Sequence, residues 1–239
     1  MPRFFIDTPP TSQEVLITGD DAWHIGRSLR MRVGDNLTVC CQKVDYFCEI
    51  LSITQENVRL SVKSQSPSGE PSISLFVYIA LPKLDKLELI AQKCTELGAC
   101  KIIPVLTKRC VSRPDEKQFE KKRERLQKIV LEASKQSGRG IIPEVSEILS
   151  LKDAVKEMSE HNISFVCYEK GGAPLSDFEI KSGYSVGLFT GAEGGFEEEE
   201  IALCESVGIK KIHLGSRILR CETAPISASS IIMHISGNM

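Results

Sequence analysis

The chain has 239 residues, of which 41% are apolar. This is enough to bury a hydrophobic core, and it excludes a peptide hormone, a collagen or a disordered tail. Thirty lysines and arginines face 32 aspartates and glutamates, giving a net charge of −2. The overall charge therefore neither requires nor forbids a polyanionic partner.

The nine cysteines form no CxxC pair and have no regular spacing relative to the four histidines, so we expect no metal site of the zinc type. Their odd number and the lack of a signal peptide after Met1 indicate a cytoplasmic protein with reduced thiols. Apolar runs of about nine residues at most predict no membrane-spanning helix.

Residues 1–65 alternate short β-rich runs with turn residues, which predicts a small β-barrel. Within it, Asp20 and Asp21 are expected to cap a short helix that places Trp23 in the core. The polar stretch 64–71 is rich in turn residues and predicts a linker. A first domain is therefore expected over residues 1–69.

After this stretch, buried apolar runs alternate with segments of helical spacing, which predicts an α/β domain over residues 70–239 with a mostly parallel sheet. Strands are expected at 73–81, 101–106, 164–168, 184–190 and 210–214, and helices at 84–97, 115–137, 151–160, 197–207 and 222–235.

Positive charge gathers in two places. Arg27, Arg30 and Arg32 lie close to His24, and their forked donors suit phosphate, although a structural role remains open. Between residues 108 and 139, eleven lysines and arginines face five acidic residues, a net charge of +6 that suits a polyanion. For 117–128 a solvated helix face is the simpler interpretation, with Lys121, Glu124, Arg125 and Lys128 exposed.

Two glycine-bearing loops follow predicted strands near the end of the chain, at 191–196 (GAEGGF) and from Gly215 onward. Ligands of open α/β sheets bind beyond the carboxyl ends of the strands, where glycines let backbone amides approach closely. The loops contain no GxGxxG and no lysine after the glycines, which disfavours dinucleotides and nucleoside triphosphates. The glutamates at 197–200 fit the field of a helix amino terminus and argue against bound phosphate.

The motif at 214–224 (LGSRILRCETA), preceded by GAEGGF, resembles the RsmE family. These enzymes use S-adenosylmethionine to methylate nitrogen 3 of a uridine in 16S ribosomal RNA and belong to the SPOUT class. Residues 3–5 and 24–31 are similar to the amino-terminal barrel of that family, and 81–83, 92–98 and 132–139 match its middle. The chain departs from the family pattern at Leu84, Ala192 and Cys221, and the change at Ala192 places cofactor affinity in question.

The resemblance implies a SPOUT-type trefoil-knotted α/β methyltransferase domain with an N-terminal PUA-like β-barrel. It also implies a homodimer with the last helix in the interface, where Ile226, Ile231 and Ile232 would suit contact or core packing equally. The small ribosomal subunit RNA is the implied partner. The positions implied for binding S-adenosyl-L-methionine are Gly191, Glu193, Gly194, Leu214, Gly215, Ile218, Leu219 and Arg220.

For catalysis we hypothesise that Arg220 stabilises the developing uracil anion. Glu222 is a candidate for positioning or proton acceptance, with helix capping as the simpler alternative. A single-stranded or splayed uridine is the expected target, because proteins read RNA sequence mostly on unstacked bases. The expected RNA contacts are Arg3, His24, Arg27, Arg30 and Arg139.

Three alternatives remain at this point: the same architecture acting on another base or a ribose 2′-OH, a non-catalytic RNA-binding assembly factor, and a nucleotide-using α/β enzyme. The sequence specifies neither the uridine nor whether naked RNA or an assembled subunit is the substrate. Lys83, Lys93, Glu96 and Gln136 recur in the family pattern, and surface ion pairs, caps or packing explain them more simply than catalysis does.

Overall fold

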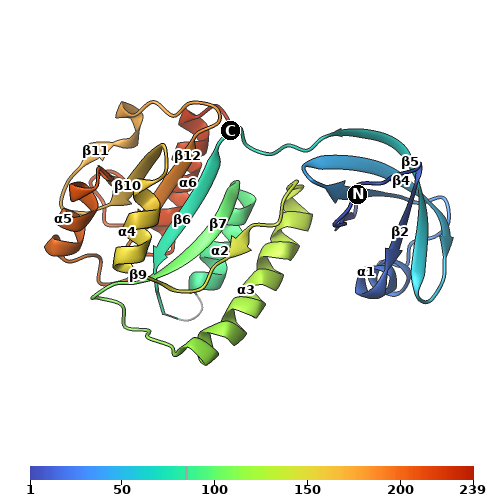
Figure 1. The fold of residues 1–239 in the computed structure, drawn as a ribbon, viewed down its shortest axis with the longest axis horizontal. Helices are drawn as coiled ribbons and strands as arrows, with labels where there is room; N and C mark the ends of the chain where they lie inside the picture. The colour runs from blue at the N-terminus through green and yellow to red at the C-terminus, as the bar shows by residue number, and fades with distance from the viewer. Residues whose placement is uncertain (84–85) are drawn as a thin grey trace. The chain divides into compact units, whose positions relative to one another are not determined.

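The computed structural model describes residues 1–83 and 86–239, so the predicted helix start at Leu84 lies outside the described residues. The chain divides into two compact units (Figure 1). Unit 1 comprises residues 1–70 and 134–141, and unit 2 comprises residues 71–133 and 142–239. Each unit has its own buried apolar cluster.

Unit 1 is built on a mixed five-stranded sheet with the order β1-β3-β4-β5-β2. The edge strand β1 pairs in parallel with β3, and the other neighbours pair antiparallel. Within the described residues β1 and β2 do not pair, so the expected barrel is an open half-barrel. The strands are β1 (Arg3–Phe5), β2 (Glu14–Thr18), β3 (Asn36–Cys41), β4 (Val44–Ile53) and β5 (Asn57–Pro67).

A short helix, α1 (Gly19–Trp23), leads directly into a π-helical turn, η1 (His24–Ser28). The expected cap by Asp20 and Asp21 is wrong in detail, because both lie inside the first turn and the N-cap residue is Thr18, whose side chain makes no capping bond. Their charges still favour this end of the helix. The expected burial of Trp23 is also wrong, since the side chain is 59% exposed.

The expected linker at 64–71 is largely incorrect. Residues 64–67 continue β5 and pair with β4, from Phe47 opposite Ser64 to Val44 opposite Pro67. Their polar composition suggested turns, but the partner strand supplies the hydrogen bonds that keep them extended. Pro67 is tolerated because this part of β5 lies beyond residues 57–61, which pair with β2, and so has a partner strand on one side only.

Unit 2 contains an eight-stranded sheet with the order β11-β13-β10-β12-β6-β7-β8, and β9 also pairs with β7. Every pairing in it is parallel, as expected. The five predicted strands are confirmed as β6 (Ser74–Ala80), β7 (Ala99–Leu106), β10 (Ile163–Cys167), β12 (Ser185–Thr190) and β13 (Lys210–His213). The short elements β8 (Glu144–Val145), β9 (Leu149–Ser150), β11 (Ala173–Pro174) and η2 (Leu175–Asp177) carry too few residues to show a period, and they were not predicted.

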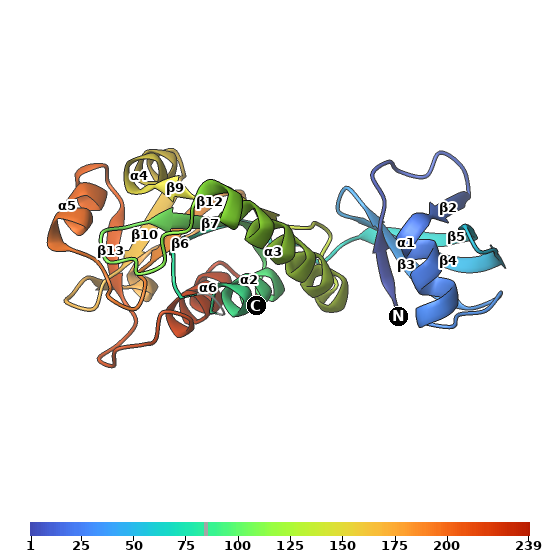
Figure 2. The same ribbon diagram turned by 90° about the horizontal axis from the view of Figure 1, so that it is seen from below.

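Helices cover both faces of this sheet. Figure 2 shows α4 (Leu151–Ser159) and α5 (Glu198–Ser206) on one side, and α2 (Lys86–Glu96) and α6 (Thr223–Ile235) on the other. Central strands buried on both faces need continuous apolar runs, and Val186, Leu188 and Phe189 of β12 are accordingly fully buried.

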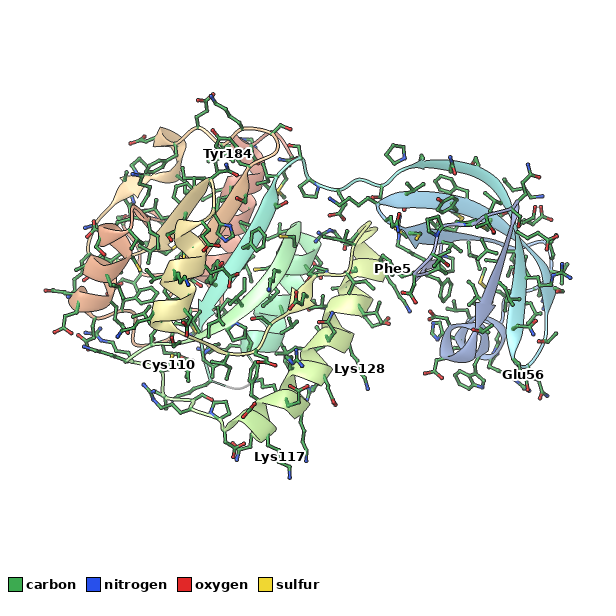
Figure 3. All side chains as sticks on the ribbon, in the orientation of Figure 1. Phe5, Glu56, Cys110, Lys117, Lys128 and Tyr184 are labelled. Atoms are coloured by element: carbon green, nitrogen blue, oxygen red, sulfur yellow. The ribbon has the colours of Figure 1, made fainter. Side chains whose placement is uncertain are left out.

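The long helix α3 (Glu116–Ser137) is amphipathic. It buries Phe119, Leu126 and Val130 in the apolar cluster of unit 2. Figure 3 shows Lys117 and Lys128 on its outer side. The expected solvated face is confirmed, because Lys121, Glu124, Arg125 and Lys128 are all exposed. Within the described residues, no helix combines the length and the hydropathy needed to cross a bilayer.

Candidate functional site

Three loops of unit 2 surround a cavity of about 540 Å³. They follow β10, β12 and β13, which are adjacent parallel strands, so their carboxyl ends meet at one edge of the sheet. The eight positions predicted for the cofactor all line this cavity. Its lining also includes Lys86, Cys167, Tyr168, Glu169, Ala192, Gly195, Phe196, His213, Ser216, Arg217, Cys221 and Ala224.

The first loop, 191–196, is a tight turn that needs its glycines. A Cβ on Gly191 would lie 3.1 Å from the Cα of Gly195, and Gly195 has a φ of +66°. The N–H of Gly195 donates to the carbonyl of Ala192 at 2.9 Å. The turn therefore closes with alanine at the position where the resemblance leads one to expect proline.

Arg109 holds this loop from outside the cavity. Its Nη1 donates to the carbonyl of Gly194 at 2.8 Å, while Nε and Nη2 donate to the two carboxylate oxygens of Glu197 at 2.8 and 3.1 Å. Hydrogen bonding to Arg109 lowers the pKa of Glu197. A planar guanidinium suits this three-bond arrangement, because it fixes the backbone of the loop and the start of α5 together.

The four glutamates at 197–200 have individual partners in addition to the helix field. Glu200 is 2% exposed, and its carboxylate accepts the N–H of Lys108 at 2.7 Å and that of Glu197 at 2.9 Å. The side chain of Lys108 pairs with Glu199, and Lys170 pairs with Glu198 at 3.1 Å. The run of acidic residues thus ties α5 to the loops around it.

Lys86, the first residue of α2, bridges the two glycine-bearing loops. Its Nζ lies 3.2 Å from a carboxylate oxygen of Glu193 in the first loop and 3.2 Å from one of Glu222 at the end of the second. Hydrogen bonding to Glu193, with a further contribution from Glu222, raises the pKa of Lys86. The ammonium therefore stays charged between the two carboxylates.

Glu222 does not cap the last helix. It occupies the N-cap position of α6, but its side chain makes no capping hydrogen bond, so that alternative is wrong. Its carboxylate instead accepts the thiol of Cys221 at 3.3 Å and pairs with Lys86. Its own backbone N–H, more than these partners, lowers the pKa of Glu222 against the opposing effect of burial.

The second loop, 214–222, is open to a ligand. Gly215 has a φ of +92°, and its N–H donates to Nδ1 of His213 at 3.1 Å. In the described part of the chain, the backbone N–H groups of residues 216–220 donate no hydrogen bond. The Arg220 side chain is 83% exposed and reaches Glu222 only at 4.0 Å. The loop thus offers unused backbone donors and a free cation beside the cavity.

Two of the five predicted RNA contacts are engaged in ion pairs inside unit 1. Arg3 donates to the two carboxylate oxygens of Asp45 at 2.6 and 2.5 Å, and Arg139 donates to those of Glu70 at 2.7 and 2.8 Å. Both arginine side chains are nearly buried, at 11% and 5% exposure.

The other three predicted RNA contacts, His24, Arg27 and Arg30, are exposed. The ring of His24 packs edge-on against Phe4, with 6.3 Å between centroids. The described residues contain no cluster of histidine, cysteine and acidic side chains that could hold a metal ion.

Sequence reasoning did not single out Lys86 and Arg109. A signal for Lys86 was present, because it follows the predicted strand at 73–81, whose motif continues through Lys83. Arg109 was hidden in the basic run at 108–139. Neither pattern reveals that Arg109 pairs with Glu197 or that Lys86 pairs with Glu193, because these partners are far apart in the sequence.

Comparison with known proteins assigns the class. A family model described as an RNA methyltransferase domain matches residues 69–233, and one described as an RNA methyltransferase PUA domain matches residues 17–63. The ribosomal RNA small subunit methyltransferase E of Bacillus subtilis is 36% identical over 98% of this chain and 96% of its own. The ribosomal RNA small subunit methyltransferase E of Rickettsia conorii is 33% identical over 84% of this chain and 81% of its own.

A solved structure agrees. The ribosomal RNA small subunit methyltransferase E from Neisseria gonorrhoeae, bound to S-adenosyl methionine, has a TM-score of 0.88 with 27% identity, covering 99% of this chain and 98% of that one. The fold and both family models define an RNA methyltransferase with a PUA domain. More narrowly, the chain belongs to the ribosomal RNA small subunit methyltransferase E family.

Proposed function

We propose that this protein transfers a methyl group from S-adenosyl-L-methionine to nitrogen 3 of a uridine in 16S ribosomal RNA. One observation carries the proposal: the two glycine-bearing loops, distant in sequence, line a single cavity together with a third loop. The named relatives act on small-subunit ribosomal RNA, and the solved relative binds this cofactor. We propose residues 1–69 and 70–239 as the RNA-binding and catalytic domains.

The residues around the cavity fit the cofactor. The unused N–H groups of residues 216–220 match the edge of an adenine, which needs hydrogen-bond donors and close backbone approach. The carboxylates of Glu169 and Glu193 suit a cationic ligand. When bound, the cofactor supplies an electrophilic methyl group on a positively charged sulfur. The proposed binding positions are Gly191, Glu193, Gly194, Leu214, Gly215, Ile218, Leu219 and Arg220.

Arg220 is the proposed catalytic cation. Nitrogen 3 of uracil is protonated at neutral pH, and its loss of a proton places negative charge on the neighbouring carbonyl oxygens. A guanidinium keeps its charge at any ordinary pH, so it stabilises that anion and does not itself accept the proton, which passes to solvent water at the open cavity. The exposed Arg220 side chain is free to meet a base that enters the cavity.

Glu222 is proposed as a positioning residue. A carboxylate with a lowered pKa is a weaker proton acceptor, so the hydrogen bond from its own backbone N–H and, to a smaller extent, the ion pair with Lys86 make proton removal by Glu222 unfavourable. The proposed role is supported by Lys86, which contacts both Glu222 and Glu193 of the first loop and thereby links the two loops.

RNA contacts are proposed for the exposed His24, Arg27 and Arg30. For Arg3 and Arg139 we propose a structural role in place of the RNA contact expected from the sequence, because their guanidinium groups are held by Asp45 and Glu70. Removing a buried charge from its partner to reach a phosphate would leave a buried carboxylate unpaired.

We further propose the trefoil knot, the homodimer and a cytoplasmic location, where small ribosomal subunits are found in bacteria. The knot is supported by the path of the last segment. Strand β13 lies on the side of β10 away from β12, and α6, which follows β13 in the chain, returns to pack against β12 and β6. The dimer is supported by Ile231 of α6, which is 38% exposed, whereas Ile232 belongs to the core of the single chain. Light scattering should give twice the mass of one chain.

The test uses small ribosomal subunits from a bacterial strain that lacks this activity, with nucleoside mass analysis of the product RNA. We expect N3-methyluridine with the wild-type protein and a loss of at least about a hundredfold in rate with Arg220→Ala, the scale seen when one anion-stabilising donor is removed. Arg125→Ala, an exposed arginine on α3, is the matched control. A methylated ribose, or unchanged turnover by Arg220→Ala, would contradict the assignment.

A further inference from the structure

One stretch of unit 1, residues 23–33, leaves several large apolar side chains in water. Trp23 is 59% exposed, Leu29 41% and Val33 65%. A single exposed apolar residue is normal on a protein surface, but a group that includes the only tryptophan of the chain indicates a binding surface. We call residues 23–33 the Trp23 segment.

The same segment carries three exposed arginines without ion pairs to the described residues. Arg27, Arg30 and Arg32 are exposed, and none forms an ion pair with any residue that the structure describes. Of two nearby carboxylates, Asp21 pairs with Lys135 at 3.0 Å. Asp35 accepts the backbone N–H of Arg32 at 2.7 Å and forms no ion pair with the described guanidinium groups of the segment. The three guanidinium groups are therefore available to an anionic partner.

The backbone presents these side chains in a fixed, unusual conformation. The π-helical turn η1 is closed by the N–H of Leu29 on the carbonyl of His24 at 2.9 Å, and the N–H of Met31 donates to Ile25 at 3.1 Å. Arg30 has a φ of +53°, a conformation that normally favours glycine. π-Helical turns are rare in proteins, and those that occur are often found at functional sites. Ile25, fully buried, anchors the segment to the core.

The chemistry of the surface selects its partner. An exposed aromatic face next to arginines is the combination that binds single-stranded nucleic acid, where the ring stacks on a base and the cations meet phosphates. A paired RNA duplex hides its base faces and offers no stacking surface to an indole. The charge and the ring together therefore favour an unpaired strand.

We propose that the Trp23 segment binds an unpaired stretch of RNA, with one base stacked on the indole of Trp23 and the neighbouring phosphates on Arg27 and Arg30. This inference rests on the proposed action on RNA. It adds the surface that holds an unpaired strand outside the cavity and the residue that contacts a base there.

The fluorescence of Trp23 provides a direct test, because no other tryptophan contributes. The full-length protein without cofactor is titrated with a twelve-nucleotide single-stranded RNA of mixed sequence and, separately, with the duplex of that sequence. We expect saturable quenching by the single strand and several-fold weaker binding of the duplex. Saturated binding without a fluorescence change, equal response to both RNAs, or no binding to the single strand would overturn the proposal.

Variants separate stacking from charge in a filter or anisotropy assay with labelled RNA. Trp23→Ala should weaken binding about tenfold, within the range of one stacked base, at every salt concentration. Trp23→Phe, which keeps a ring, should retain most of the affinity. Arg27→Ala should make the binding constant for RNA less dependent on salt concentration, by the amount expected for about one lost phosphate contact. Leu16→Ala, an equally exposed apolar residue of β2, is the control.

Two further outcomes are decisive. If Trp23→Ala binds like the wild type, or if Trp23 responds to anionic phospholipid vesicles and not to RNA, the inference fails. Calorimetry of the cofactor and the Arg220→Ala methylation assay test the proposed function separately, since Trp23 lies in unit 1 and the cavity in unit 2. An active enzyme with a silent Trp23 would therefore overturn only this inference.

Discussion

The buried ion pair between Glu70 and Arg139 predicts a large loss of stability when it is broken. The side chains are 8% and 5% exposed, and the Glu70 carboxylate accepts two guanidinium bonds and the N–H of Gly140 at 2.7 Å. Glu70→Gln keeps the shape of the side chain and leaves the Arg139 charge without its counter-ion. Removing one partner of a buried pair costs about 3–5 kcal/mol, so we expect unit 1 to lose roughly 3 kcal/mol.

Native-state hydrogen exchange of the amides in β3, β4 and β5 measures this change for unit 1 alone. The matched control is Glu88→Gln, which breaks the pair with Arg125 at 2.8 Å. Arg125 is 70% exposed, and surface pairs contribute less than about 1 kcal/mol. Equal effects of the two substitutions would refute the structural role of Glu70.

The same pair predicts the pH dependence of unit 1. Burial alone would raise the pKa of Glu70, but the hydrogen bonds and charge of Arg139 and the N–H of Gly140 lower it on balance. A carboxyl group with a depressed folded pKa stabilises the protein above its unfolded pKa, about 4.3. This contribution is lost as the pH falls through the folded value, and Glu70→Gln should abolish that part of the acid dependence.

RNA binding provides a second readout for Arg139. The logarithm of the RNA-binding constant falls linearly with the logarithm of the salt concentration. A phosphate contact by Arg139 would make this slope steeper by about 0.7 to 0.9. We expect Arg139→Gln to leave the slope unchanged when binding is measured under conditions where the variant is folded. A slope reduced by one contact, with little loss of stability, would restore Arg139 to the RNA interface.

Two further predictions concern the cavity. Arg109→Ala should weaken cofactor binding several-fold by calorimetry, because the first loop loses the bond to Gly194, whereas Arg123→Ala on α3 should have no effect. Lys86→Gln removes the cation between Glu193 and Glu222. The demethylated product carries one positive charge fewer than the methyl donor, so the ratio of the donor's binding affinity to that of the product should increase. A preference that falls, or that changes equally with Lys93→Gln, would contradict the assigned role of Lys86.

Much of the fold could be predicted because long elements carry a clear period. The runs that became β6 and β12 are continuous and apolar, and α3 shows alternating buried and exposed faces. The predictions failed where tertiary contacts override local composition. Residues 64–67 look like a turn but pair with β4, and Trp23 looks like a core residue although Ala22 and Ile25 supply the buried face.

The candidate site shows the same division. The glycines and the charged residues of the two loops were visible in the sequence, because their chemistry is local. Arg109 and Lys86 were not, because their function depends on partners that the fold brings close from distant positions. The alternative cap at Glu222 failed for a related reason, since its carboxylate is drawn to Lys86.

Two of the three loops around the cavity differ in how many hydrogen bonds hold them. The first is fastened by Arg109 and by the buried Glu200, whereas residues 216–220 of the second make no backbone hydrogen bonds as donors in the described chain. Ordering a free segment costs conformational entropy, and a preformed one costs little. Between these two loops, the entropic cost of ordering the backbone around a ligand therefore falls mainly on residues 216–220 of the second.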